Sequence, residues 1–293
     1  MLFNLRPIKK HYGAYIDCNN ITELSPDDYM KIKEYLSIYG LLIFNHQQMD
    51  DEALINFSRK IGNGKLEEPA RNISLAENRR YIAYLTNLND SDGEPLGFPG
   101  SKTDYWHSDQ EFRINPASVS ILYGVVTQCE GGNTSFASTS IDIFNFSNEN
   151  ANKKMPDLNP FWSTRKPATS HDNVPHITVA HPVIIKNKKT EKEYVYVSEN
   201  TIEFLEDDNP VIYSEMLKAS ILGKILSEEN IYSHSWSGGD LILYDNSQLL
   251  HRRECFSGNR FIKALKIYPD NDYQPKIAGK EIEEVHYAYC ERK

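Results

Sequence analysis

The residues best suited to chemistry in this chain lie in the segment Trp106-His107-Ser108-Asp109. On an extended backbone, side chains two residues apart point to the same side, so the imidazole of His107 and the carboxylate of Asp109 can chelate one metal ion. The chain contains 9 His and 41 acidic residues. A His followed two positions later by an acid arises by chance roughly once in such a chain. A surface histidine with an aspartate in a turn is therefore the competing interpretation.

A second histidine, far along the chain, strengthens the metal interpretation. Two imidazoles and one carboxylate on one octahedral face are the ligand set of non-haem iron(II) oxygenases, and they leave three coordination positions open. His251 fits the third ligand, because it lies between two apolar segments that have the character of strands, residues 240–244 and 261–265. His234, just before the first of these segments, is the main rival.

The local pattern predicts the elements that position these residues. Ser25-Pro26-Asp27-Asp28 is a capped helix start with Pro in the first turn, which predicts a helix over 26–38 that Gly40 ends. The compact apolar run at 41–44 predicts a buried strand, and a second helix is expected at 50–61. Further strands are expected at residues 119–126, 176–186, 194–197, 240–244 and 261–268, and a further helix at 209–226.

These elements predict a mostly β protein with flanking helices. Many short strands separated by Gly and Asn turns, with helices at one end, are typical of a β-sandwich or jelly roll. No break in composition marks a linker, so we expect one domain over residues 1–293. The turn-rich stretch around 87–104 predicts a lid loop, with a surface loop as the alternative. The polar region around 140–175 predicts a helical insert.

Composition argues against several classes of function. The 32 Lys and Arg against 41 Asp and Glu give a net charge of −9, which disfavours nucleic acid and anionic membranes as partners. No apolar stretch reaches the roughly 18 residues of a membrane span, and the N-terminus lacks the pattern of a secretory signal. Four scattered cysteines without a CxxC pair favour a reduced, cytoplasmic protein. We expect a small-molecule substrate, and the sequence leaves a homo-oligomer open.

Several segments together resemble the taurine dioxygenase (TauD/TfdA) family of iron(II)- and 2-oxoglutarate-dependent oxygenases. The segments that carry the resemblance are residues 106–109, Pro116-Ala117-Ser118, Gly131-Gly132-Asn133-Thr134, residues 240–246, His251 and Arg260. They occur in the order expected of the family, and the similarity extends over most of the chain. It implies the fold of a double-stranded β-helix, which is a cupin-like jelly roll.

The resemblance also implies a role for each matching residue. His107, Asp109 and His251 would ligate Fe(II). Thr134 and Arg260 would bind the distal carboxylate of 2-oxoglutarate, a task that suits the planar guanidinium of Arg260. With O2 as the other co-substrate, such an enzyme oxidises an unactivated C–H bond and releases succinate and CO2.

The resemblance does not identify the substrate. In taurine dioxygenase a second arginine, four residues after the 2-oxoglutarate arginine, binds the sulfonate. This chain has Ala264 there, so taurine and simple sulfonates are disfavoured. Lys263 or Lys266 is a candidate to supply the missing cation in place of that arginine. The alternative is that these lysines are solvated residues at the edge of a strand. Tyr105 and Trp106 are candidates to form the wall of the substrate pocket. The alternative is that both are aromatic residues of the hydrophobic core.

The sequence therefore predicts an oxygenase that hydroxylates a small polar substrate, with amino-acid-derived molecules among the candidates. An isonitrile-forming or desaturating member of the same family, acting in natural-product biosynthesis, is the alternative within this class. Outside it, the alternatives are a jelly-roll protein that binds metal or ligand without turnover and a zinc hydrolase that uses the same three ligands.

Overall fold

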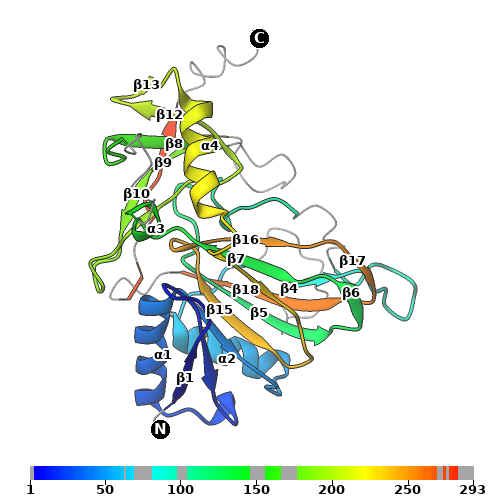
Figure 1. Ribbon diagram of the computed structural model, residues 1–293. Helices are drawn as coiled ribbons and strands as arrows, with labels where there is room; N and C mark the ends of the chain where they lie inside the picture. The colour runs from blue at the N-terminus through cyan, green and yellow to red at the C-terminus, as the bar shows by residue number, and fades with distance from the viewer. Residues whose placement is uncertain are drawn as a thin grey trace.

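The computed structural model describes residues 3–62, 64–68, 81–97, 104–145, 156–165, 177–268, 273–274 and 277–282. Within these ranges the chain is built mainly of strands, with helices at opposite ends of the molecule (Figure 1). Among the described residues, no helix combines the length and the apolar character that crossing a bilayer requires.

A seven-stranded sheet forms the largest layer. In spatial order its strands are β1 (Asn4–Pro7), β2 (Ala14–Asp17), β3 (Leu41–Phe44), β15 (Leu241–Asp245), β5 (Val119–Val126), β18 (Phe261–Ile267) and β4 (Ala83–Thr86). Neighbouring strands pair antiparallel except β2 and β3, which are parallel. The strands expected at 41–44 and 119–126 are confirmed with the same bounds.

A smaller sheet faces the first. It consists of β14 (Ile231–His234), β7 (Thr134–Ser138) and β16 (Leu249–Arg253), and the pair β6 (Cys129–Gly131) and β17 (Phe256–Gly258) continues beyond it. Buried side chains of both sheets form one core cluster, with Leu122 and Ile262 from the large sheet against Phe136 and Leu249 from the small one. Two facing, mainly antiparallel sheets are typical of a jelly roll, so the predicted fold class is confirmed.

Two helices cover the outer face of the large sheet. α1 (Pro26–Tyr39) follows a short 3-10 helix, η1 (Ile21–Glu23), and begins at Ser25, which forms a capping box. It ends at Gly40, whose φ of 68° is the left-handed conformation that favours glycine. α2 (Asp51–Ile61) begins at the N-cap Asp50. Apolar residues of both helices and of the sheet form a second core cluster, so the large sheet is buried on both faces.

A second group of strands lies at the other end of the molecule (Figure 1). Its five-stranded sheet has the order β13 (Asn209–Pro210), β12 (Thr201–Glu206), β8 (Phe161–Arg165), β9 (Thr178–Pro182) and β19 (Lys280–Ile282), and β10 (Ile184–Lys186) pairs with β11 (Glu193–Val195). α4 (Ser214–Ile225) packs on β12, and α3 (Asp142–Asn145) contacts α4. Apolar side chains of this region form a third core cluster.

Two predictions in this region are wrong in part. The helical insert expected around 140–175 contains α3, which has four residues, but residues 161–165 form β8. This segment becomes a strand because β12 and β9 pair with it on both sides and because its aromatic and β-branched residues suit a sheet. Residues 146–155 and 166–176 lie outside the described residues. The helix expected at 209–226 begins only at Ser214, since the two residues of β13 pair with β12.

The lid loop expected around 87–104 is described only in part. Its first half forms a tight turn, in which the carboxylate of Asp90 accepts hydrogen bonds from the backbone N–H groups of Asp92 and Glu94, both over 2.9 Å. Residues 98–103 lie outside the described residues. The lid therefore stays a prediction.

Candidate active site

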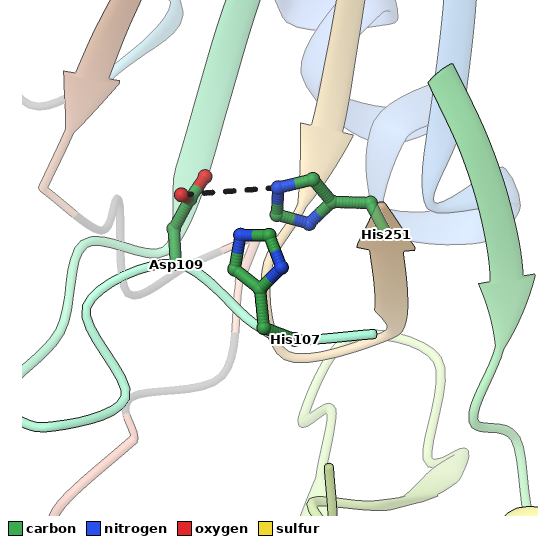
Figure 2. A group of neighbouring side chains, drawn as sticks. All are labelled: His107, Asp109 and His251. Atoms are coloured by element: carbon green, nitrogen blue, oxygen red, sulfur yellow. Dashed lines mark ion pairs between the residues drawn. The ribbon is translucent and has the colours of Figure 1, made fainter. Parts of the chain in front are cut away.

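Two distant chain segments meet at the candidate metal site. His107 and Asp109 precede β5, and His251 lies on β16. His107 and His251 form an isolated antiparallel bridge, in which each backbone N–H donates to the carbonyl oxygen of the other, over 3.1 and 2.9 Å. One potential ligand atom from each of the three side chains lies within 4.8 Å of the others. Figure 2 shows the three side chains gathered around one point, so the structure brings the predicted ligands together.

Asn246 fixes the loop that carries Asp109. Its side-chain oxygen accepts a hydrogen bond from the backbone N–H of Asp109 over 3.1 Å, and its side-chain amide donates to the carbonyl oxygen of Ala117 over 3.0 Å. The hydroxyl of Ser108 donates to the backbone carbonyl oxygen of Asn246 over 2.7 Å. Sequence reasoning placed Asn246 in the family-like segment 240–246 but gave it no role, although that segment was the available signal.

The surroundings orient His107 and keep His251 and Asp109 in the form that binds a metal. Nδ1 of His107 lies 3.0 Å from the carbonyl oxygen of Tyr105. A carbonyl oxygen only accepts, so this contact selects the tautomer in which Nδ1 carries the proton and Nε2 is the nitrogen placed to coordinate. Burial, together with the neighbouring His107, lowers the pKa of His251 well below its ordinary value, so this imidazole is neutral. Burial alone would raise the pKa of Asp109, but the positive charge of Lys266 holds it below its ordinary value.

The donor set fits ferrous iron. Two neutral imidazoles and one ionised carboxylate form the facial ligand set of non-haem iron(II) sites. Neither His251 nor Asp109 has to lose a proton before it can bind a metal ion. Oδ1 of Asp109 faces the other ligands, at 3.8 Å from Nε2 of His251, and is the oxygen placed to coordinate.

A cavity of about 270 Å³ opens beside these ligands, and all three line it. The large sheet contributes apolar side chains such as Leu85, Leu122 and Ile262 to its walls. The polar side chains that line it besides the three ligands are Thr86, Thr134, Tyr244, Arg253, Arg260 and Lys266. A mostly apolar pocket with a few placed polar groups is typical of a small-molecule site.

Thr134 and Arg260 both line this cavity. The indole Nε1–H of Trp236 donates to Oγ1 of Thr134 over 3.0 Å. Because an indole nitrogen only donates, the hydroxyl proton of Thr134 remains available to a ligand. Arg260 is 5% exposed, and its Nε donates to the carbonyl oxygen of Gly132 over 3.3 Å. Burial, followed by the positive charge of Arg253, lowers the pKa of Arg260 to about 10, so Arg260 is still charged at neutral pH.

Lys263, predicted as a substrate-binding residue, does not line the cavity. Ile262, Ala264 and Lys266 of β18 line it. Successive side chains of a strand point to opposite faces, so Lys263 points to the helices that cover the sheet. There its Nζ lies 2.5 Å from Oδ1 of Asp51. The structure therefore does not bring Lys263 to the predicted metal ligands, and Lys266 is the lysine that faces them.

Neither aromatic residue that precedes the metal motif lines the cavity. Trp106 is 3% exposed and belongs to the third core cluster, with the guanidinium of Arg252 4.9 Å from its ring centroid. The core alternative is thus the observed one for Trp106. Tyr105 is 38% exposed, and its ring centroid lies 5.0 Å from that of His107, so it flanks a predicted metal ligand without reaching into the cavity.

His234, the rival third ligand, lies apart from the cluster. Its Nε2 is 3.1 Å from Oδ2 of Asp240, and its Nδ1 is 3.1 Å from the hydroxyl of Tyr232. Both ring nitrogens are therefore engaged in a buried polar contact, which is a structural use of the residue.

The facing sheets and the His-Asp-His cluster define a jelly-roll protein with a candidate non-haem metal centre. A sequence profile described as "Taurine catabolism dioxygenase TauD, TfdA family" matches residues 4–266. The chain belongs to this family.

Relatives of known function and known structure agree with this assignment. The chain is 23% identical over 247 residues to the alpha-ketoglutarate-dependent 2,4-dichlorophenoxyacetate dioxygenase of Burkholderia sp. (strain RASC), a match that covers 78% of this chain and 81% of the relative. It is 20% identical over 264 residues to the pentalenolactone F synthase of Streptomyces arenae, with 83% and 87% covered.

Solved structures share the fold. A taurine dioxygenase from Burkholderia xenovorans matches with a TM-score of 0.74 at 18% identity, over 96% of both chains. The complex of AAD-2 with Mn(II) and N-oxalylglycine matches with a TM-score of 0.72 at 18% identity, over 91% of this chain and 97% of that one. The family consists of iron- and 2-oxoglutarate-dependent dioxygenases, so the predicted enzyme class and its cofactors are confirmed.

Proposed function

We propose that this enzyme hydroxylates an unactivated C–H bond of a small polar substrate that carries an anionic group. In the balanced reaction, one atom of O2 enters the substrate as a hydroxyl group and the other enters the succinate formed from 2-oxoglutarate, with release of CO2. His107, Asp109 and His251 would hold Fe(II). Thr134 and Arg260 would bind the distal carboxylate of 2-oxoglutarate. The bound iron and keto acid supply the activation of O2.

One observation carries the proposal: the three candidate ligands and the pair Thr134 and Arg260 line the same cavity. A keto diacid needs a metal at one end and a cation with a hydroxyl donor at the other, and this cavity offers both. The apolar residues of its walls exclude water from the rest of the bound molecule, which strengthens the polar contacts at its two ends.

An anaerobic titration tests this assignment. Adding Fe(II) and 2-oxoglutarate to the metal-free protein is expected to produce the visible charge-transfer band of an iron-chelated keto acid. Replacing Arg260 by Ala is expected to raise the 2-oxoglutarate concentration that half-saturates the band by roughly ten- to a hundredfold, because a hydrogen bond to a charged group contributes about 1.5–3 kcal/mol. Absence of the band in the unmodified protein would support a zinc hydrolase. A band without succinate formation for any substrate would support a binding protein.

The charge of the cavity supports an anionic substrate. Among the described residues, Arg253, Arg260 and Lys266 line it, against the carboxylate of Asp109. After Fe(II) and 2-oxoglutarate are added to this count, positive charges still exceed negative ones, and an acidic substrate would balance them. Two relatives are named for dioxygenation of carboxylic acids, 2,4-dichlorophenoxyacetate and (S)-phenoxypropionate.

Arg253 is the residue best placed to bind such a group. It lies two positions after His251 on β16, so it shares the pocket face of that strand. Its guanidinium carbon lies 5.0 Å from the ring centroid of Phe256, and that of Arg260 lies 5.6 Å from the same ring. Within the described part of the chain, the buried Nε of Arg253 has no hydrogen-bond partner.

Exchange of Arg253 for Gln is therefore expected to raise the KM for the acidic substrate. Succinate release would be measured over a panel of carboxylic acids and amino acids, each beside its neutral amide. We expect turnover with an acid and not with its amide, and a KM for that acid roughly tenfold or more higher in Arg253→Gln, while half-saturation by 2-oxoglutarate changes less. Arg252→Gln is the matched control, because Arg252 lies over Trp106 and outside the cavity. Equal use of acid and amide would contradict the anionic substrate.

Product mass separates the outcomes within the class. Hydroxylation adds one oxygen atom to the substrate, whereas a desaturase removes two hydrogen atoms.

A further inference from the structure

Three side chains form a row across three neighbouring strands of the large sheet, beside the metal ligands. Ser120 of β5 is paired through its Cα with Tyr244 of β15 on one side and with Lys266 of β18 on the other. Directly opposed residues of antiparallel strands point to the same face of a sheet. The register of β15, β5 and β18 thus places a phenol, a hydroxyl and an ammonium group in line on the pocket face.

All three groups donate to one oxygen of Asp109. Oδ2 accepts hydrogen bonds from the hydroxyl of Ser120 over 2.6 Å, from the phenol of Tyr244 over 2.7 Å and from the ammonium group of Lys266. Lys266 also donates to Oγ of Ser120 over 3.0 Å. The other oxygen, Oδ1, faces His251. The row therefore divides the carboxylate into one oxygen that is saturated by donors and one that is left for a metal ion.

The cation in this row has a particular electrostatic effect. The side chains of Lys266 and Asp109 are 21% and 15% exposed, so solvent screens their interaction only in part. A fixed positive charge beside the ligating carboxylate raises the energy of a metal ion in proportion to the charge of that ion. It therefore disfavours the trivalent ion more than the divalent one.

We propose that Lys266 is a positioning residue that keeps Asp109 a one-oxygen ligand and poises the bound iron toward the ferrous state. This inference rests on the proposed iron site. Lys266 lies on the pocket face of β18 beside the predicted metal ligands and donates hydrogen bonds to Asp109 and Ser120. A role in substrate binding alone would not require these two hydrogen bonds.

The test is the equilibrium between ferric and ferrous iron in the loaded protein, without 2-oxoglutarate. A redox titration with mediators would compare the unmodified enzyme with Lys266→Met, which keeps the length of the side chain and removes its charge. We expect the ferric-to-ferrous ratio at a fixed potential to rise at least tenfold in Lys266→Met, which is about 59 mV for a one-electron couple. Lys266→Arg, which keeps the charge, is expected to show the same ferric-to-ferrous ratio as the unmodified enzyme.

Lys263→Met is the matched control. It removes the same charge from the same strand, but Lys263 points away from the cavity and pairs with Asp51. Its ferric-to-ferrous ratio is expected to stay within about twofold of the unmodified enzyme, because its charge lies on the far side of the sheet.

Two results would overturn the proposal. One is a ratio in Lys266→Met equal to that of the unmodified enzyme, and the other is the same shift in Lys263→Met. Failure of the unmodified protein to retain iron would instead reject the proposed metal site, so the two failures are distinguishable. Since Lys266→Arg must give the ratio of the unmodified enzyme, a shift that follows from any exchange of residue 266, and not from loss of its charge, does not count as support.

Discussion

Replacing His251 by alanine is expected to abolish both iron retention and succinate formation. His251 supplies one of three ligand groups, and removing it leaves a site with two ligands on a single short loop. Loss of a supporting contact to a metal ligand typically costs ten- to a hundredfold in affinity or activity, so we expect loss of the ligand itself to exceed roughly a hundredfold. The bridge between residues 107 and 251 uses backbone atoms, so the variant is expected to keep this contact.

Iron content after desalting and succinate release are the two measurements. His234→Asn is the matched control, because His234 is also a buried histidine but pairs with Asp240 outside the cavity. His234→Asn is expected to retain iron even if the loss of its buried contact with Asp240 lowers the melting temperature. Retained iron and normal turnover in His251→Ala would mean that the third ligand lies elsewhere in the chain.

Replacing Arg165 by methionine is expected to lower the free energy of unfolding by about 3–5 kcal/mol, the range seen when one partner of a buried ion pair is removed. Arg165 is 1% exposed, and its Nε lies 2.8 Å from Oε2 of Glu111. Its Nη2 donates to the carbonyl oxygen of Tyr196 over 2.8 Å. Without the guanidinium, the described part of the chain leaves the buried carboxylate of Glu111 with hydrogen bonds from the neutral groups of Ser198 and Asn200 and no counter-charge.

Urea unfolding followed by circular dichroism measures this change. The exposed ion pair between Arg6 and Asp17, with side chains 58% and 47% exposed, gives the control. Arg6→Met is expected to change the free energy of unfolding by less than about 1 kcal/mol, as is usual for surface pairs. A loss below about 1 kcal/mol in Arg165→Met as well would contradict the role given to the buried pair.

The parts of the fold that follow from local patterns could be predicted from the sequence. The capped start at Ser25 and the glycine at position 40 predicted the bounds of α1, and an unbroken apolar run predicted β3. Residues 161–165 were not predicted as a strand, because β8 exists through pairing with β9 and β12, which come later in the chain. Local composition carries no information about such partners.

In the candidate site too, some features follow from local sequence patterns and others depend on how distant strands pair. Its metal ligands could be predicted from residue type, spacing and a family resemblance. The sequence could not tell whether Lys263 or Lys266 faces the cavity, because β18 is buried on both faces and hydrophobic alternation does not tell which face is the pocket. The contacts of Ser120 and Tyr244 with Asp109 depend on the register of three strands, which no spacing in the sequence reveals.

The mutual backbone hydrogen bonds of residues 107 and 251 align the two ligand-bearing segments through main-chain atoms. No side chain takes part in these two hydrogen bonds, so exchanging the side chain at either position leaves the alignment available. The entropy cost of bringing the two distant segments together is incurred when the chain folds. A variant designed with other metal-binding side chains at these positions would therefore inherit an ordered scaffold.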